Sequence, residues 1–229
     1  MDVGDVVLIV AAHPDDEILG AGASAARWVA EGKSVFSLIL AEGVSSRFPE
    51  ADQRTTEGLV RLRDHALRAH EIVGDQLLPL GKLRDNRMDA VPLLEIVKQI
   101  EKVIVKVQPS CVLTHGPWDV NVDHRRTHEA ALAACRAIPG SSVRLLACFP
   151  ILSSTEWRGD PQNAFSPNLF VDVSAYETSK ADALLAYADE VREAPHPRSP
   201  SVALAQMTVW GSFVGASSAE AFQVVRWII

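Results

Sequence analysis

One imidazole and three carboxylates follow an apolar segment close to the start of the chain. Residues 6–12 (VVLIVAA) run directly into residues 13–17 (HPDDE). Charged and imidazole groups are costly to place beside an apolar core unless something pairs with them. His13 and Asp16 are three residues apart across a strand-to-helix turn, where both side chains can reach one ion. The motif therefore predicts a divalent metal ion at this turn.

Helix capping is a second explanation for part of this motif. An Asp before a helix caps its first turn, and Glu17 is most simply a first-turn residue that interacts with the helix dipole. Capping accounts for one carboxylate, but it leaves His13 and a second Asp without a reason. Asp16 can serve as cap and as metal ligand together.

A second group of polar residues follows the apolar segment 111–115 (CVLTH). The loop and the helix start behind it contain Asp119, Asn121, Asp123, His124 and His128. His124 and His128 are four residues apart, so they share one helix face, and either or both can bind a metal. Taken alone, an exposed helical turn explains these two imidazoles equally well.

Apolar and amphipathic segments alternate along most of the chain. Predicted strands cover residues 6–12, 35–40, 76–80, 111–115 and 143–149, and predicted helices cover 18–31, 55–73, 90–107 and 124–138. This alternation is typical of parallel βαβ units, and continuous apolar strands fit a sheet that is covered on both faces. We therefore expect an α/β fold, a Rossmann-like doubly wound and mostly parallel sheet of strand order 3-2-1-4-5.

The last third of the chain is less regular, and we expect it to form an irregular α+β extension of one domain, 1–229. The sequence predicts an extended segment at 169–173, helices at 174–192 and 201–210, and an apolar segment at 222–229. This apolar end suits either a core strand or an interface between subunits. A homo-oligomer is therefore one of the two expectations for this segment. The polar segment 44–54 is predicted to be a loop.

The predicted strand order decides where the polar groups meet. It places the first strand beside the fourth, at the switch point where ligands bind in open α/β sheets, beyond the carboxyl ends of the strands. The two polar groups therefore converge on one crevice. Two imidazoles and a carboxylate with an open position are typical of catalytic zinc, and they also suit Fe(II).

Composition disfavours several other functions. The net charge is −7, which disfavours attraction to nucleic acid or to an anionic membrane. No apolar run reaches the length of a membrane span. Three cysteines without a paired spacing, and a start that lacks the basic region of a signal peptide, lead us to expect a cytoplasmic protein. A G-x-G-x-x-A match at 20–25 falls inside a predicted helix, which favours helix–sheet packing over dinucleotide binding.

The two polar motifs together resemble those of the PIG-L/LmbE-like zinc N-deacetylases. Residues 12–17 (AHPDDE) follow the first strand, and residues 121–124 (NVDH) follow the fourth. This family includes the N-acetylglucosaminyl-phosphatidylinositol de-N-acetylases and the deacetylases of the mycothiol and bacillithiol pathways. Residues 153–157 (SSTEW), 195–199 (PHPRS) and 219–222 (AEAF) resemble a bacterial branch of it.

The resemblance implies a role for most residues of the two motifs. His13, Asp16 and His124 would bind one zinc ion per chain, with Fe²⁺ as the alternative ion. Asp15 would be the general base. Asp123, directly before the third ligand, would orient the groups that bind the metal.

One position departs from the family pattern. Many relatives carry His-Pro-Asp-His at the second motif, and the first His helps to stabilise charge in the transition state, whereas this chain has Asn121 there. His115, His128 and His196 are the candidates to supply that imidazole. His196 is favoured because it lies between two prolines in a loop that can fold over the site, and an exposed loop histidine is the competing interpretation.

Four residues are expected to bind the substrate: Arg47, Asn121, His128 and Arg198. The two arginines can hold a hydroxyl, a phosphate or a carboxylate. Solvated loop arginines are the alternative interpretation for both.

The function implied by the resemblance is hydrolysis of an acetamide. A metal-bound water would attack the acetyl group of a small N-acetylated amino sugar or sugar conjugate, with Asp15 as general base. One alternative is an amidase that cleaves a larger amide conjugate. Another is a non-catalytic sugar-binding protein with a vestigial metal site, and the intact Asp15 argues against it, since binding alone needs no base beside the ligands.

Overall fold

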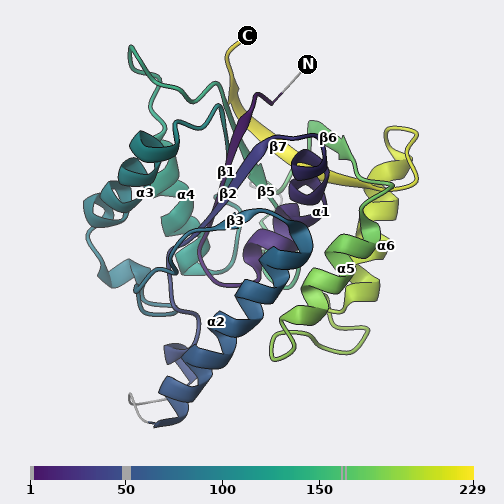
Figure 1. Ribbon diagram of the computed structural model, residues 1–229, viewed down its shortest axis with the longest axis horizontal. Helices are drawn as coiled ribbons and strands as arrows, with labels where there is room; N and C mark the ends of the chain where they lie inside the picture. Colours follow the sequence, from purple (N-terminus) through teal and green to yellow (C-terminus); the bar gives the residue numbers. More distant parts are fainter. Residues whose placement is uncertain (1–2, 48–52, 161, 163) are drawn as a thin grey trace.

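A single seven-stranded sheet crosses the molecule, with helices packed on both of its faces (Figure 1). The computed structural model describes residues 3–47, 53–160, 162 and 164–229. The strands are β1 Val6–Ala11, β2 Ser34–Ile39, β3 Gln76–Leu77, β4 Cys111–His115, β5 Leu145–Phe149, β6 Leu169–Asp172 and β7 Ala219–Trp227. The helices are α1 Asp16–Ala30, α2 Gln53–Val73, α3 Leu93–Val107, α4 Val122–Ala134, α5 Glu177–Ala186 and α6 Pro200–Ser212. Short 3-10 turns cover Ser45–Arg47 and Met88–Ala90.

The parallel part of the sheet confirms the predicted doubly wound fold. The strand order is β3-β2-β1-β4-β5-β7-β6, and the first five strands of the chain pair in parallel. In β1, Ile9 lies opposite Ser37 of β2 on one side and Leu113 of β4 on the other. The switch point therefore lies between β1 and β4, as predicted.

The C-terminal third is the predicted α+β extension, and its two strands, β6 and β7, join the sheet. β7 pairs antiparallel with β5 and with β6, so it lies between two strands that precede it in the chain. The register between β5 and β7 shifts at Leu146 and Ala147. β7 begins at Ala219, earlier than the predicted 222, and α5 covers only Glu177–Ala186 of the predicted helix at 174–192.

Two helix boundaries differ from the prediction for local reasons. Pro92 caps α3, and the 3-10 turn before it replaces the predicted start at 90. α4 begins at Val122 because the Asn121 side chain caps it, accepting a hydrogen bond of 2.8 Å from the Asp123 N–H. Of the predicted loop at 44–54, residues 48–52 lie outside the described residues.

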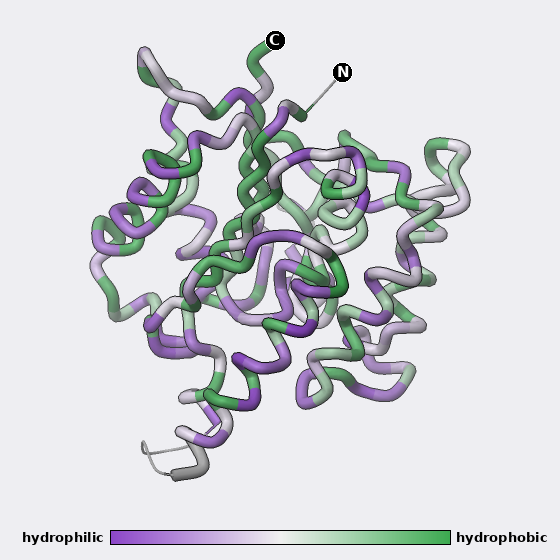
Figure 2. The backbone as a smooth tube through the Cα atoms, in the orientation of Figure 1, coloured by the Kyte–Doolittle hydropathy of each residue, from purple (hydrophilic) through white to green (hydrophobic). Residues whose placement is uncertain are grey.

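The two faces of the sheet bury two separate apolar cores. Successive residues of β1 alternate between them, with Val7 and Ile9 in one core and Leu8 and Val10 in the other. The first core packs against α1, α2, α5 and α6, and the second packs against α3 and α4. Figure 2 shows the apolar central strands between helices with polar outer faces. Among the described residues, no helix is both long and apolar enough to cross a bilayer.

Helix α1, which carries part of the polar motif, packs unusually close to the sheet. A Cβ atom on Gly20 would lie 2.4 Å from the Phe149 ring of β5, so only glycine permits this approach. The G-x-G-x-x-A segment therefore serves helix–sheet packing, as expected.

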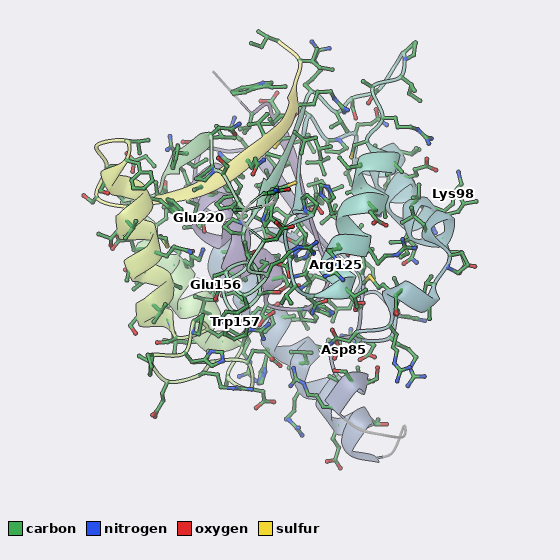
Figure 3. The ribbon with its side chains drawn as sticks, turned by 180° about the vertical axis from the view of Figure 1, so that it is seen from behind. Asp85, Lys98, Arg125, Glu156, Trp157 and Glu220 are labelled. Atoms are coloured by element: carbon green, nitrogen blue, oxygen red, sulfur yellow. The ribbon has the colours of Figure 1, made fainter. Side chains whose placement is uncertain are left out.

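A buried ion pair fastens the middle of α1 to α5 and β7. Lys180 Nζ lies 2.5 Å from Glu220 Oε1 and donates to the Leu19 carbonyl at 2.7 Å. Glu220, labelled in Figure 3, also accepts hydrogen bonds from the Ala23 and Ser24 N–H groups, at 3.1 and 2.7 Å. The side chains of Lys180 and Glu220 thus form hydrogen bonds with backbone groups in the middle of α1, and these bonds hold α1 against α5 and β7.

We expect Glu220→Ala to lower the free energy of unfolding by about 3–5 kcal/mol, because it leaves the buried Lys180 ammonium without its partner. Urea denaturation followed by circular dichroism measures the loss. Lys98→Ala is the matched control, since Lys98 pairs with Glu101 on the exposed face of α3 (Figure 3) and should change stability by less than about 0.5 kcal/mol. Equal losses in the two variants would contradict this account of the Lys180–Glu220 pair.

Candidate active site

Three side-chain atoms meet at the spacing that a tetrahedral metal ion requires. His13 Nδ1 lies 3.2 Å from Asp16 Oδ2 and 3.3 Å from His124 Nε2, and the last two atoms are 3.2 Å apart. Ligand atoms at about 2.0–2.1 Å from a tetrahedral zinc lie about 3.3 Å from one another. Asp16 Oδ1 is buried and has no hydrogen-bond partner among the described residues. These residues therefore fit a bound divalent cation.

The fold accounts for how the three residues come together. β1 ends at Ala11, and the turn after it is closed by the His13 N–H, which donates to Asp16 Oδ2 at 2.9 Å. Asp16 begins α1, and His124 lies in the first turn of α4, behind β4. Because β1 and β4 are neighbours, the two motifs meet at the carboxyl ends of both strands.

A carboxylate lies behind each imidazole ligand. His13 Nε2 is 3.0 Å from Asp123 Oδ2 and 3.2 Å from Asp85 Oδ1, and His124 Nδ1 is 3.0 Å from Asp119 Oδ2. Such partners hold a proton on the outer ring nitrogen, so that the other nitrogen is free to bind a metal. This arrangement leaves His13 Nδ1 and His124 Nε2 as the ring atoms that could bind a metal.

The electrostatics of the cluster follow from burial and close pairing. Burial lowers the pKa of His124, but Asp16 and Asp119 outweigh this effect and raise it to about 9. Burial opposes ionisation of Asp16, yet His124 and His13 hold the pKa of this carboxyl well below its usual range. The site therefore stabilises positive charge beside Asp16, which a divalent cation can supply in place of protons.

The supporting carboxylates are themselves held by the backbone and by hydroxyl groups. Asp123 accepts hydrogen bonds from the Asn86 and Met88 N–H groups at 2.8 and 2.9 Å. Asp119 accepts from the Asn121 N–H at 2.8 Å and from the hydroxyls of two residues in the loop after β5, Ser154 and Thr155.

Two of these supporting residues were given no role by the sequence analysis. Asp119 lies in the polar loop of the second motif. Its position two residues before Asn121 is the sequence feature that could have identified it as a partner of His124. Asp85 (labelled in Figure 3) follows β3 and belongs to neither polar motif.

Asp15 lies beside the ligands in a strained backbone conformation. Its φ is 106° and its ψ is −29°, a region that costs a non-glycine residue about 1–3 kcal/mol. Burial raises the pKa of the Asp15 carboxyl well above its usual range, and the Arg198 guanidinium, 3.0 Å from Oδ2, opposes this shift.

The candidate metal site opens, through His13, onto a cavity of about 180 Å³. Its lining residues come from five separate segments, and they are His13, Pro14, Asp15, Gly43, Ser46, Arg47, Asp85, Asn86, Asn121, Glu190 and Arg198. A larger cavity of about 560 Å³ lies between Trp118, Phe165 and Trp210. It shares no lining residue with the smaller cavity, so we place the active site at the smaller one, where the titratable groups converge.

Arg47 and Arg198 both line this cavity, as their assignment to the substrate requires. A single buried carboxylate, Glu190, pairs with both: its Oε1 lies 2.5 Å from Arg47 Nη2 and its Oε2 lies 3.4 Å from Arg198 Nη1. No motif marked Glu190 in the sequence, because it follows α5 in the irregular last third of the chain. Asn121 also lines the cavity, and its Nδ2 donates to Asn86 Oδ1 at 3.1 Å.

None of the three candidate imidazoles lines the cavity. His115 Nε2 accepts a hydrogen bond of 2.9 Å from the Ala12 N–H, and its ring stacks on His124 with centroids 4.1 Å apart. His128, one turn after His124, bonds through Nδ1 to the His115 carbonyl at 2.9 Å. His196 Nδ1 accepts from the Arg198 N–H at 3.1 Å.

The structure therefore places His128 and His196 away from their predicted roles. The side chain of His128 is directed at the β4 backbone, so it is no longer assigned to the substrate. The ring of His196 meets Trp157 edge-on, with centroids 6.2 Å apart. The loop that carries His196 instead brings Arg198 to Asp15.

We expect zinc to stabilise protein from which metal has been stripped by a chelator, by about 2.7 kcal/mol when free zinc is a hundred times its Kd. His124→Ala should abolish this gain because it removes one of the three ligand atoms. His196→Ala is the matched control and should keep it, since His196 lies outside the cluster. Thermal unfolding with and without zinc measures the difference, and an equal gain in both variants would exclude the cluster as the metal site.

Comparison with known proteins agrees with this geometry. The family model described as PIG-L, GlcNAc-PI de-N-acetylase, matches residues 8–135, which is more than half of the chain and includes both polar motifs. The "Probable N-acetyl-alpha-D-glucosaminyl L-malate deacetylase 2" of Bacillus anthracis is 27% identical over 187 residues, which cover 80% of this chain and 80% of that protein.

Two solved structures share the fold over almost the whole chain. The N,N'-diacetylchitobiose deacetylase of Pyrococcus horikoshii has a TM-score of 0.78 at 19% identity, covering 97% of this chain and 84% of that one. The 4-carboxy-2-hydroxymuconate hydratase GalB of Pseudomonas putida KT2440 has a TM-score of 0.78 at 22% identity, covering 99% and 98%. These two likenesses establish the fold alone, because the same fold carries two different reactions. On the family match and the motifs it covers, this chain belongs to the PIG-L family of de-N-acetylases, hydrolases of N-acetyl amides.

Proposed function

We propose that this chain is a zinc-dependent N-deacetylase that hydrolyses the acetamide of an amino sugar or sugar conjugate. One observation carries the proposal: three ligand atoms lie 3.2–3.3 Å apart directly beside the Asp15 carboxylate, at the wall of a cavity. The Bacillus anthracis relative and the Pyrococcus horikoshii neighbour are both named as deacetylases of N-acetyl sugars, which supports the substrate class.

The ligand set would supply the electrophile of the reaction. His13, Asp16 and His124 would hold the zinc ion, which when bound polarises the acetamide carbonyl and makes water more acidic. The supporting residues Asp85, Asp119 and Asp123 fix the orientation of the two imidazoles.

Asp15 is suited to move the proton. Its carboxylate lines the cavity next to His13 and accepts a proton from the attacking water. The water oxygen adds to the carbonyl carbon, the C–N bond breaks, and the proton passes from Asp15 to the leaving nitrogen. The products are acetate and a free amine.

Arg198 is the cation that faces the reacting groups in place of the missing imidazole. Its Nε donates to Ser153 Oγ at 2.9 Å, and its Nη1 contacts Asp15 and Glu190. Arg198 also lines the cavity, where its guanidinium can meet a bound ligand. A guanidinium stays charged throughout the reaction, so Arg198 can stabilise the developing oxyanion.

Arg47 would bind the part of the substrate that is not hydrolysed. It lies at the more exposed side of the cavity and is paired with Glu190. A hydroxyl, phosphate or carboxylate of the substrate can replace part of this pairing.

The cavity also bears on the alternative functions. At about 180 Å³, it is smaller than the 300–1,000 Å³ typical of sites that enclose drug-sized ligands. It therefore suits an acetamide and the sugar ring that carries it better than a bulky amide conjugate. A protein that only binds sugars gains nothing from a strained Asp15 beside a metal site.

Asp15→Asn is expected to retain zinc and to lower kcat by about 10²–10⁴-fold, the usual contribution of general acid–base catalysis. Release of acetate from a panel of N-acetylglucosamine conjugates and nucleotide-linked acetamido sugars measures turnover, and longer N-acyl analogues test for an amidase. Asp189→Asn, at an exposed acid paired with Arg61, is the control and should retain activity. A zinc-loaded Asp15→Asn enzyme with normal turnover would show that Asp15 is not the base.

Arg198→Gln is expected to lower kcat by about 10²–10³-fold, because it removes a charged donor to the oxyanion. Arg198→Lys should recover part of this loss, since it restores the charge without the fork of donors. Arg192→Gln is the control, because Arg192 donates to the backbone carbonyls of Asp189 and Val191 at the surface. A rise in KM with kcat unchanged would instead assign Arg198 to substrate binding alone.

A further inference from the structure

We infer that Glu17, which the sequence analysis treats as an ordinary first-turn helix residue, positions the catalytic carboxylate of Asp15. The inference rests on the proposed function of Asp15 as base. Glu17 Oε2 accepts a hydrogen bond of 3.1 Å from the Asp15 N–H. This bond holds the backbone of the residue whose φ of 106° is disfavoured for any side chain other than glycine.

Glu17 is in turn fixed by two buried neighbours from other segments of the chain. The Tyr187 hydroxyl, just after α5, donates to Glu17 Oε1 at 2.6 Å. His70 Nε2, near the end of α2, lies 3.4 Å from the same oxygen. All three side chains are at most 3% exposed. A carboxyl group that is buried this deeply needs hydrogen-bonding partners, and these partners restrict its position.

The network continues away from the active site to the sheet. His70 Nδ1 lies 2.6 Å from Asp75 Oδ1, and Asp75 Oδ2 accepts from the Ser37 hydroxyl of β2 at 2.6 Å. Burial lowers the pKa of His70, but Asp75 and Glu17 raise it to about 10. His70 is therefore cationic at neutral pH and pairs with carboxylates on both sides.

These groups act on the reaction only through Asp15. Neither Glu17 nor His70 lines the 180 Å³ cavity, so neither can touch the substrate. The direct link is the bond from Glu17 to the Asp15 N–H. Without it, the strained backbone of Asp15 can relax, and its carboxylate moves relative to the metal-binding residues. A displacement of about 1 Å at a reacting group can cost 10²-fold in rate.

A purely structural role for Glu17 makes a different prediction. In that case its loss lowers stability but leaves each folded, zinc-loaded molecule fully active. Glu220 offers a matched control, because it is also a buried glutamate that accepts backbone N–H groups of α1, yet it does not contact Asp15. Comparing the two sites separates positioning of Asp15 from general support of the helix.

The kinetic test compares Glu17→Ala, Glu17→Gln and Glu220→Gln, each normalised to bound zinc. Glu17→Ala is expected to lower kcat by about 10–100-fold with KM and zinc content unchanged. Glu17→Gln should recover part of kcat, because its amide oxygen can still accept from the Asp15 N–H. Glu220→Gln should lower the Tm and leave kcat unchanged. Unaltered kcat in Glu17→Ala, or an equal loss in Glu220→Gln, overturns the inference.

A crystal structure of zinc-loaded Glu17→Ala tests the same inference without an activity assay. We expect Asp15 to leave its positive φ and its carboxylate to move away from Arg198. An Asp15 backbone and carboxylate that superpose on those of the unsubstituted protein overturn the inference. If the unsubstituted protein hydrolyses no acetamide, the proposed function fails, and the φ of Asp15 still decides whether Glu17 positions this residue.

Discussion

The site depends on one electrostatic requirement, the neutralisation of carboxylates buried at a sheet edge. Asp16 is fully buried between two imidazoles, and three further carboxylates stand behind those imidazoles: Asp85, Asp119 and Asp123. Such groups are stable in an apolar interior only when they are paired or bind a metal. A divalent cation at His13, Asp16 and His124 meets this requirement, and it also supplies the electrophile that amide hydrolysis needs.

The position of α1 is the second constraint, because Asp16 at its start is a proposed metal ligand and Asp15 directly before it is the proposed general base. Gly20 permits close packing on β5, Glu220 and Lys180 fasten the middle of the helix, and Glu17 holds the turn that leads into it. The contacts of Gly20 and of the middle of the helix are made with β5, α5 and β7. The C-terminal third of the chain therefore supports the site without providing metal ligands, and it adds Arg198 and Glu190 to the cavity wall.

Local patterns in the sequence predicted the parallel sheet, its switch point and the meeting of the two motifs. Each of these follows from short-range features, namely continuous apolar strands and polar residues directly behind them. The insertion of β7 between β5 and β6 could not be predicted, because it depends on pairing between segments far apart in the chain. The role of Glu190 could not be predicted for the same reason. It pairs with Arg47 and Arg198, which lie on different loops far apart in the chain.

The choice of His196 for the missing imidazole shows where residue type alone misleads, because Arg198 of the same loop is the residue that contacts Asp15. Both lie in the same proline-bounded loop, and only the path of the backbone decides which one faces Asp15. Asp85 was missed for a similar reason, because a single carboxylate after a two-residue strand carries no recognisable spacing. The family resemblance suggested the candidate metal ligands, whereas the carboxylates behind them are identified only by their distances in the structure.

Anomalous diffraction from a crystal of the zinc-loaded protein tests the central claim most directly. The account predicts one zinc ion per chain, within about 2.0–2.2 Å of His13 Nδ1, an oxygen of Asp16 and His124 Nε2. The Asp15 carboxylate should line the same cavity. A zinc ion bound through His13 Nε2, a zinc ion bound elsewhere, or a fully zinc-equilibrated crystal without an anomalous peak at these residues would contradict it.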